Sequence, residues 1–216
     1  MIMAKIKTDE ILGTDIYAIT AEEYSRGRDN IEVVKEMLDG GIKLIQYREK
    51  KKPAGEKLEQ CKKIRKLTKE AGCKFIVNDD VDIAMLVGAD GIHVGQDDLP
   101  VNEIRKLVGE EMLIGLSTHS PKQAKEAASS GADYIGVGPV FKTNTKEDVV
   151  EPVGLSYVDY VYKNMDIPFV AIGGIKKHNI QEVMEKGAYC FAMVTEIVEA
   201  DDIPDRIEKI RELLHQ

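Results

Sequence analysis

The stretch that decides the fold is KFIVNDDVDIAMLVGADGIHVG, residues 74–95. It begins with a short apolar run rich in β-branched residues and continues through a segment with helical spacing. A Gly-Ala-Asp stop then leads into a second apolar run at Gly91. A strand, a helix and a further strand in this order are typical of a parallel sheet covered by helices.

The same alternation extends along the whole chain. Eight short apolar runs occur, and charged segments with helical period separate them. Eight units in 216 residues leave 27 residues per unit, which fits a compact (β/α)8 TIM barrel. We find no linker or low-complexity segment and expect one catalytic domain over residues 1–216. The expected strands are Asp15–Thr20, Ile42–Arg48, Lys74–Asp79, Gly91–Gly95, Leu113–Thr118, Tyr134–Pro139, Phe169–Gly174 and Tyr189–Thr195.

Local signals agree with this reading. Ser120-Pro121 is a helix start, with an N-cap followed by proline in the first turn. The tail from Pro204 to Leu214 has helical spacing and should form the last outer helix. A dinucleotide-binding sheet is disfavoured, because Gly136-x-Gly138 lacks the third glycine and continues into Pro139.

Composition excludes several classes of protein. The chain carries 30 basic and 38 acidic side chains, a net charge of -8, so we expect no nucleic-acid binding. No apolar stretch approaches the ~20 residues of a membrane span, and we expect a cytoplasmic protein without membrane contact. Cys61, Cys73 and Cys190 have no metal-binding spacing and are interpreted as reduced thiols.

The second expected strand ends in residues able to bind an anion. A period of two directs Gln46, Arg48 and Lys50 to one side of the chain. In a barrel of this type the C-terminal ends of the strands carry the active site, so these cations suggest a bound anion. The alternative is a charged strand exit, in which neighbouring charges such as Glu49 and Lys52 are simply solvated.

Carboxylates follow the third and fourth strands. Asp79 and Asp80 end one run, and Asp98 follows the next along the same rim. Oxygen ligands without accompanying cysteine or histidine match Mg2+, which often binds one or two carboxylates plus substrate phosphates. The alternative is helix capping, since all three aspartates stand where a helix could begin.

A phosphate site is expected after strands 7 and 8. Gly173-Gly174 and Val194-Thr195 stand in the loops that commonly bind phosphate in such barrels. The polar loop Thr143–Lys146 follows strand 6 and offers further donors. Two phosphate-binding regions on one rim predict two phosphorylated substrates. Tight turns and a solvated loop are the competing explanations.

The motifs together resemble one family. The chain contains QYREK at 46–50, NDD at 78–80, HVGQDD at 93–98, GLSTHS at 115–120, GVGPVFKTNTK at 136–146, AIGGI at 171–175 and AMVTEI at 192–197. In order and spacing these resemble the thiamine-phosphate synthase family over nearly the whole chain. GQDD and the TxTK element are the most specific pieces, whereas AIGGI is shared by many phosphate-binding barrels.

The resemblance implies an enzyme that joins 4-amino-2-methyl-5-(diphosphooxymethyl)pyrimidine to a thiazole phosphate with Mg2+, forming thiamine phosphate and diphosphate. It implies small-molecule partners and is compatible with a homo-oligomer. By motif position, the diphosphate-binding residues would be Gln46, Arg48, Lys50, Asn78 and Lys146, and the metal ligands Asp79 and Asp98. Ser117 would lie beside the pyrimidine, and the thiazole-phosphate side would comprise Thr143, Asn144, Thr145, Gly174, Val194 and Thr195.

This chemistry fits the residue types. Ionisation to a pyrimidinylmethyl cation needs stabilisation of the departing diphosphate, a role expected for Arg48, Lys50 and Lys146, more than a protein base. His119 could be a base, as in the related thiazole tautomerase, whereas His93 follows an apolar pattern and is interpreted as structural. The tautomerase and a non-catalytic thiamine-phosphate sensor are the alternatives. Thr195 stands where the family usually has serine.

Overall fold

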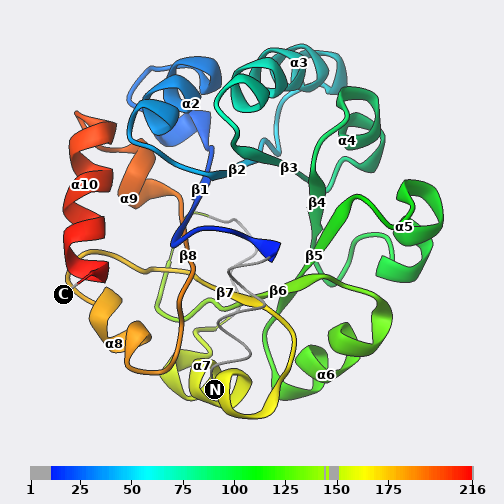
Figure 1. Ribbon diagram of the computed structural model, residues 1–216, viewed down its shortest axis with the longest axis vertical. Helices are drawn as coiled ribbons and strands as arrows, with labels where there is room; N and C mark the ends of the chain where they lie inside the picture. Colours follow the sequence, from blue (N-terminus) through cyan, green and yellow to red (C-terminus); the bar gives the residue numbers. More distant parts are fainter. Residues whose placement is uncertain (1–10, 144, 146–150, 216) are drawn as a thin grey trace.

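The computed structural model describes residues 11–143, 145 and 151–215. Eight parallel strands form a closed barrel in the order β1 to β8, and the helices form a ring around it (Figure 1). The strands are β1 Ile16–Ile19, β2 Leu44–Tyr47, β3 Lys74–Asn78, β4 Gly91–Val94, β5 Leu113–Thr118, β6 Tyr134–Val137, β7 Phe169–Ile172 and β8 Phe191–Met193. The expected (β/α)8 barrel is confirmed.

Helices follow the strands in the expected alternation. They are η1 Glu22–Tyr24, α2 Asn30–Asp39, α3 Ala54–Glu70, α4 Val81–Val87, α5 Val101–Val108, α6 Pro121–Ser130, α7 Gly154–Asn164, α8 Ile180–Met184, α9 Thr195–Val198 and α10 Ile203–Leu214. Ser120 caps α6 as expected, since its side chain accepts a hydrogen bond from the Gln123 backbone. The C-terminal helix is also confirmed.

Several strands end earlier than the sequence pattern indicates. The strand expected over Phe169–Gly174 ends at Ile172, and the strand expected over Tyr189–Thr195 comprises only Phe191–Met193. Thr195 instead begins α9. The chain turns away from the strand direction at the rim, because Gly173 and Gly174 have positive φ values and Val194 is already the N-cap of α9.

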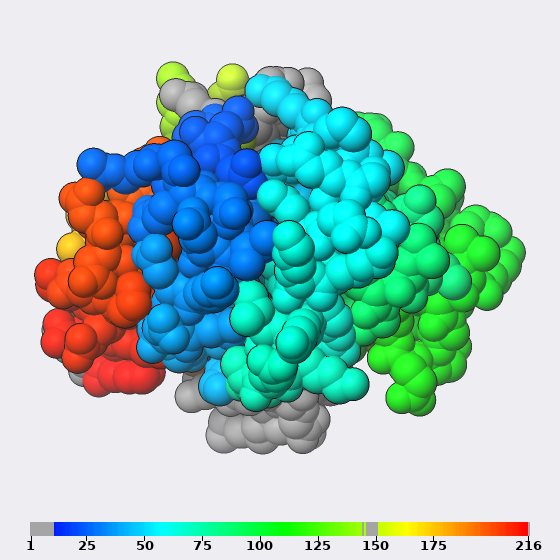
Figure 2. Space-filling model, turned by 90° about the horizontal axis from the view of Figure 1, so that it is seen from above, coloured from blue at the N-terminus to red at the C-terminus, as the bar shows by residue number. Residues whose placement is uncertain are grey.

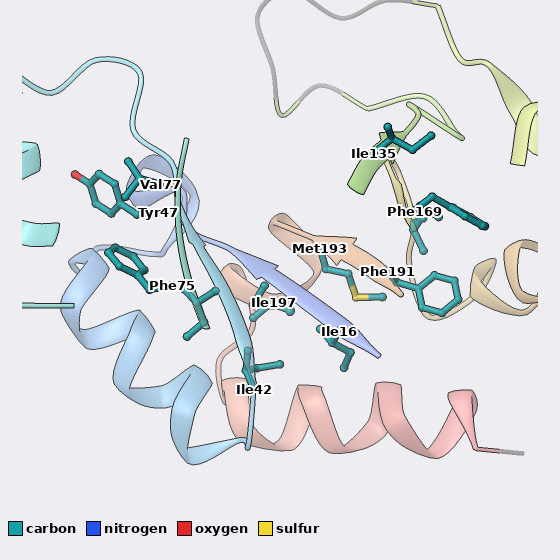
Figure 3. Close-up of a cluster of buried hydrophobic side chains, with 14 of the residues drawn as sticks. Ile16, Ile42, Tyr47, Phe75, Val77, Ile135, Phe169, Phe191, Met193 and Ile197 are labelled. Carbon is teal, nitrogen blue, oxygen red and sulfur yellow. The ribbon is translucent and has the colours of Figure 1, made fainter. Parts of the chain in front are cut away.

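Two apolar layers stabilise the barrel. Residues Ile16 and Ala18 point from β1 into the layer between strands and helices, part of which Figure 3 shows. Their neighbours Tyr17 and Ile19 point into the barrel interior, as a period of two requires. The outer layer contains nearly all of the large aliphatic side chains, whereas the smaller inner layer also contains the tyrosines of β1 and β6.

The first and last units of the barrel pack against each other. In Figure 2 the blue N-terminal part and the red C-terminal part of the chain lie side by side, and α10 contacts α2. Arg211 of α10 donates hydrogen bonds to the carbonyls of Gly40 (2.9 Å) and Gly41 (3.0 Å). A Cβ atom on Gly40 would lie 2.7 Å from Ile207, so glycine permits this close approach.

The cysteines and the helices of the described part of the chain bear on two further expectations. Cys61, Cys73 and Cys190 are buried and form no disulfide, as expected. None of the helices among these residues combines the length and apolar character that a bilayer crossing requires.

Candidate active site

A cavity of about 780 Å³ opens at the C-terminal ends of the strands. Its position agrees with the usual site of catalysis in barrels of this type. Most of the residues expected in the site contribute to its lining, namely Gln46, Arg48, Asn78, Ser117, Thr143, Thr145, Gly174, Val194 and Thr195. Asn144 and Lys146 lie outside the described residues.

A chain of polar side chains crosses the floor of the cavity. Gln46 Nε2 donates to Tyr17 Oη (2.8 Å), which lies 3.0 Å from Tyr134 Oη. Tyr134 Oη is 3.1 Å from His93 Nδ1, and His93 Nε2 is 3.0 Å from Ser117 Oγ. His93 is buried, as a structural residue would be, but its ring also lines the cavity and contacts a predicted site residue.

An acidic corner lies beside Asn78, at the ends of β3 and β4. Lys50 and Asp79 form an ion pair there, and Asp98 accepts a hydrogen bond from the Gly95 backbone (2.7 Å). Burial raises the pKa of Asp79; the neighbouring Asp98 raises it further, whereas Lys50 opposes the increase. The structure therefore brings Lys50, Asp79 and Asp98 together.

The backbone at Asp79 is strained. Its φ of +61° lies in the left-handed region, and Asp80 N donates to Asn78 O (2.7 Å) across it. A three-residue turn with positive φ at a residue other than glycine is rare and energetically costly. Such strain tends to persist at functional sites, where the surrounding structure holds a side chain in a required direction.

Helix capping does not explain Asp79 or Asp98. The N-cap of α4 is Asp80, whose side chain caps no backbone N–H and instead pairs with Lys57 (2.8 Å). The N-cap of α5 is Pro100. Of the two explanations left open by the sequence, capping is therefore wrong for both expected metal ligands.

The donor set suits Mg2+ bound jointly with a substrate. Among residues 11–143, 145 and 151–215, no group of three or more His, Cys, Asp or Glu side chains is arranged to hold a metal ion. Asp79 and Asp98 supply two hard oxygen ligands, and Mg2+ commonly takes one or two carboxylates with substrate phosphates and waters completing the shell. Burial, and to a lesser extent the neighbouring Asp98, raises the pKa of Asp79, and a bound cation would favour its ionised form.

The opposite side of the rim is formed by the main chain that follows β7. Gly173 and Gly174 have φ values of +99° and +64°. A Cβ atom on Gly174 would lie 2.7 Å from the Lys142 carbonyl oxygen, so only glycine fits. The buried Asn179 fixes this turn, because its side chain donates to Gly174 O (3.0 Å) and accepts from Lys176 N (2.7 Å).

Sequence reasoning missed a cation on this side. Lys176 lines the cavity, and its Nζ lies 3.3 Å from Thr195 Oγ1 and 3.5 Å from the buried carboxylate of Glu196. Arg206 also pairs with Glu196 (3.0 Å), so the carboxylate retains a partner if Lys176 turns toward a ligand. The signal was available, since Lys176 follows AIGGI directly.

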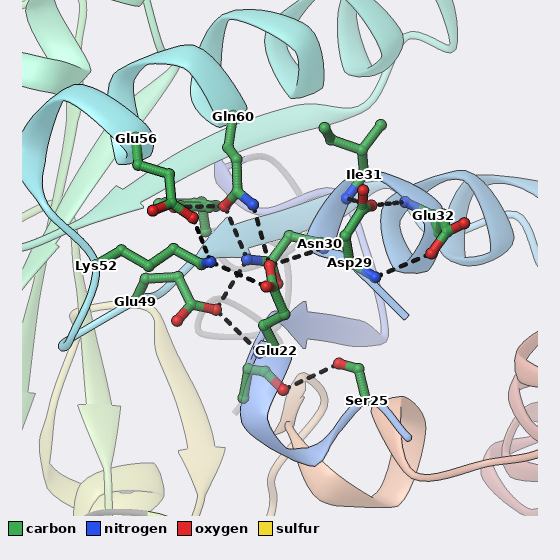
Figure 4. Close-up of polar contacts among 12 residues, drawn as sticks. Glu22, Ser25, Asp29, Asn30, Ile31, Glu32, Glu49, Lys52, Glu56 and Gln60 are labelled. Carbon is green, nitrogen blue, oxygen red and sulfur yellow. Dashed lines mark hydrogen bonds and ion pairs between the residues drawn. The ribbon is translucent and has the colours of Figure 1, made fainter. Parts of the chain in front are cut away.

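The expectation that Glu49 and Lys52 are simply solvated is wrong. Both residues belong to the loop that follows β2, and Figure 4 shows them in a network of polar contacts. Glu49 accepts hydrogen bonds from the Glu22 backbone (2.9 Å) and Asn30 Nδ2 (2.8 Å). Lys52 pairs with Glu22 (2.9 Å) and Glu56 (2.6 Å), while its side chain is only 17% exposed. This network anchors the loop that carries Arg48 and Lys50.

The remaining histidines near the cavity have different surroundings. His119 Nδ1 lies 2.5 Å from the Gly138 carbonyl oxygen, an acceptor, so this nitrogen must carry the hydrogen and is not available as a base. His178 is exposed, as expected for a surface residue, but borders the cavity.

These features define a (β/α)8-barrel enzyme whose cavity has one side next to a cluster of charged side chains and a second, glycine-rich side. Comparison with known proteins narrows this class. The family described as thiamine monophosphate synthase matches residues 16–197, so the chain belongs to that family, whose enzymes are transferases.

Individual relatives agree with this assignment. A thiamine-phosphate synthase of Pelotomaculum thermopropionicum is 61% identical over 204 residues, 94% of each chain. A thiamine-phosphate synthase of Lawsonia intracellularis is 57% identical and covers 98% of each chain. A solved structure, thiamine phosphate pyrophosphorylase from Pyrococcus furiosus, is 34% identical, has a TM-score of 0.86 and covers 97% of this chain and 98% of that one.

Proposed function

We propose that the enzyme couples 4-amino-2-methyl-5-(diphosphooxymethyl)pyrimidine with 4-methyl-5-(2-phosphooxyethyl)thiazole, giving thiamine phosphate and diphosphate. The observation that carries this proposal is the presence of two differently built anion-binding regions around one cavity. In one, Arg48 lines the cavity and Lys50, Asp79 and Asp98 are grouped at the strand ends beside it; in the other, Gly174 and Thr195 line the cavity. A reaction between two phosphorylated molecules needs both regions.

The charged side would hold the diphosphate. Arg48 lines the cavity, and Lys50 lies at the acidic corner, where it now neutralises Asp79. Mg2+ held by Asp79 and Asp98 would supply charge neutralisation for the diphosphate oxygens. Lys50 could then turn from Asp79 to the diphosphate, since the metal would take over the charge of the carboxylate. Lys146 would add a third cation.

The bond changes need little proton transfer by the protein. The C–O bond between the pyrimidine methylene and the diphosphate breaks, and its electron pair leaves with the diphosphate. The lone pair of the thiazole nitrogen then forms the new C–N bond to the resulting cation. Arg48 and Lys50 would stabilise the charge that develops on the leaving group, which is the difficult part of such a displacement.

The glycine-rich side would hold the phosphate of the thiazole. Gly174, Val194 and Thr195 would receive it through backbone N–H groups, with Thr143, Asn144 and Thr145 along the thiazole. Gln46, Asn78 and Ser117 would contact the pyrimidine part. This division places the two reacting atoms between the two phosphate groups, where binding energy from both can orient them.

No cysteine nucleophile is needed for this reaction, and Cys61 and Cys73 are poorly suited to be one. Burial raises the pKa of both Cys61 and Cys73 to about 12, so they stay protonated at neutral pH. Both belong to the layer between strands and helices, away from the cavity.

The test is formation of thiamine phosphate by the purified protein from the two substrates, with Mg2+ and with excess chelator. Product that depends on Mg2+ supports the proposal. Isomerisation of a thiazole phosphate without coupling would indicate the tautomerase instead. Binding of thiamine phosphate without any turnover would indicate a sensor.

A further inference from the structure

The polar chain beneath the cavity connects five of the eight strands. Its members are Tyr17 on β1, Gln46 on β2, His93 on β4, Ser117 on β5 and Tyr134 on β6. Tyr17, Gln46 and Tyr134 are at most 2% exposed. Hydrogen bonds in such a buried, low-dielectric place are strong, and each one influences its neighbours.

The direction of every hydrogen bond in the chain follows from its first donor. Gln46 Nε2 is an amide nitrogen, which donates but does not accept, so Tyr17 Oη accepts from it. Because Tyr17 is buried, its hydroxyl hydrogen needs an acceptor within the protein, and Tyr134 Oη is the one in contact among the described residues, so the hydrogen points to it. The hydroxyl hydrogen of Tyr134 in turn points to His93 Nδ1. Burial raises the pKa of both phenols, so both keep these hydrogens.

The direction of these hydrogen bonds fixes the tautomer of the His93 imidazole. Because His93 Nδ1 accepts from Tyr134, the hydrogen of the neutral ring must be on Nε2. His93 Nε2 therefore donates to Ser117 Oγ. The serine oxygen is then an acceptor toward the histidine, and its own hydrogen is left for another partner.

Gly115 makes room for this arrangement. A Cβ atom on Gly115 would lie 2.2 Å from Tyr134 Cζ and 2.4 Å from His93 Nδ1. Gly136 also faces the ring, since a Cβ atom there would lie 3.5 Å from His93 Cε1. The two rings lie 5.5 Å apart between centroids. The barrel interior is thus shaped around the imidazole and the phenol, which locks their relative orientation.

We propose that His93 and Tyr134 are positioning residues that hold Ser117 as a hydrogen-bond donor to an acceptor atom of the bound pyrimidine diphosphate. This inference rests on the proposed function for the identity of the substrate. This series of hydrogen bonds from Gln46 to Ser117, the relay, is present in the free enzyme. It gives Ser117 a defined polarity before substrate binds, and a serine that is already oriented loses less freedom when the complex forms.

The first test reads the tautomer directly and needs no activity. NMR of protein labelled with 15N-histidine at pH 8 should show His93 protonated on Nε2 and unprotonated on Nδ1, with its signal assigned by loss in His93→Gln. Tyr134→Phe removes the donor to Nδ1 and should weaken this preference. Tyr162→Phe is the matched control, because Tyr162 forms a tyrosine–tyrosine hydroxyl contact of 3.4 Å outside the barrel interior.

The second test measures coupling between residues that do not touch through their side chains. Tyr134→Phe should lower kcat about 5- to 10-fold, the value of roughly one hydrogen bond, with little change in the KM for thiazole phosphate. In a Ser117→Ala background, Tyr134→Phe should lower kcat by less than about 2-fold, since the serine hydroxyl that it orients is gone. Tyr162→Phe should leave kcat unchanged. Circular dichroism checks that each variant is folded.

The outcomes separate the two proposals. His93 protonated on Nδ1, or equal effects of Tyr134→Phe with and without Ser117, would overturn the relay in an active enzyme. Wild-type protein without synthase activity would overturn the proposed function, and the tautomer would then decide the relay alone. Should Tyr134→Phe fail to fold, Tyr17→Phe replaces it in the cycle, because Tyr17 supplies the hydrogen that orients Tyr134.

Discussion

The two sides of the cavity rim are built in opposite ways. The charged side presents ionised side chains from the ends of β2, β3 and β4, among them Arg48, Lys50 and Asp79. The glycine-rich side presents main chain after β7 and β8, and its cation, Lys176, is already shared with Glu196. One side can therefore be weakened by removing charge, whereas the other is weakened by adding a single methyl group.

The largest effect is expected on the charged side. Asp79→Asn removes one of two carboxylates at the proposed metal site and should lower turnover by about 100-fold or more, because charge stabilisation of a leaving group is a dominant catalytic term. Steady-state assays of thiamine phosphate formation measure it. Chelation of wild-type enzyme should have the same effect, reversed by added Mg2+.

Asp80→Asn is the matched control for this change. Asp80 is the next residue, but its carboxylate pairs with Lys57 (2.8 Å), whereas that of Asp79 pairs with Lys50. The turnover of Asp80→Asn should stay within about 3-fold of wild type. Full, metal-dependent activity of Asp79→Asn would show that the charged side of the rim is not weakened by removal of charge.

The next effect is expected on the glycine-rich side. Gly174→Ala adds a methyl group 2.7 Å from a carbonyl oxygen in a backbone with φ of +64°, and should raise the KM for thiazole phosphate about 10- to 100-fold. The KM for the pyrimidine diphosphate should change much less. Initial rates with each substrate varied in turn distinguish the two.

Gly72→Ala separates backbone strain from loss of the site. Gly72 has a φ of +59°, but a methyl group there meets no atom within 4 Å. Both variants should lose about 1–2 kcal/mol of stability from the left-handed conformation. Only Gly174→Ala should alter the KM, and an equal change in both would contradict a phosphate site at Gly174.

A smaller effect is expected for Lys176→Ala. Removal of this cation should raise the KM for thiazole phosphate about 5- to 10-fold, since one charge-assisted hydrogen bond to phosphate is lost. Added salt should reduce the difference between variant and wild type by screening. Lys177→Ala, at a residue outside the cavity lining, should leave the KM unchanged. Identical values for both variants would contradict the role of Lys176.

The smallest effect concerns the network that anchors the charged side. Burial opposes ionisation of Glu22, but hydrogen bonds from Lys52, Gln60 and the Asn30 backbone outweigh it and hold the pKa of Glu22 below its usual value. Lys52→Met should lower the free energy of unfolding by about 1 kcal/mol at pH 7. Urea unfolding measures the difference.

The pH dependence has a definite sign. A lowered pKa means that the stabilisation is fully present above the ordinary value of 4.5 and disappears as the pH falls through the lowered value. The difference between Lys52→Met and wild type should therefore shrink on acidification. Lys62→Met, which removes an exposed partner of Glu59, should lower the free energy of unfolding much less than Lys52→Met does. A larger cost there than for Lys52→Met would be evidence against the network.

The contrast between the two sides also explains what could be predicted from the sequence. Repeated apolar runs gave the barrel, because strand and helix periods are local properties. Arg48 and Asp79 were found because charged residues at strand ends are conspicuous. Lys176 was missed although it directly follows AIGGI, because only the structure shows that its Nζ lies beside Thr195 Oγ1.

Longer-range contacts were less predictable still. Nothing local distinguishes His93 as the neighbour of Ser117, since the contact joins side chains of two different strands, and a tyrosine on a third strand contacts the other ring nitrogen of His93. Lys52 and Glu49 looked like ordinary solvated charges, and only the packing of α2 and α3 around them makes a network. Such contacts depend on how distant segments meet, which residue types alone do not encode.

Closure of the barrel also bears on how the chain folds. The register pairs Ile16 of β1 with Phe191 of β8, so one edge of the first strand has no partner until nearly all of the chain has been synthesised. An unpaired strand edge can associate with other chains. During translation, the interval before β8 leaves the ribosome is therefore the stage at which this protein depends most on remaining separate from its neighbours.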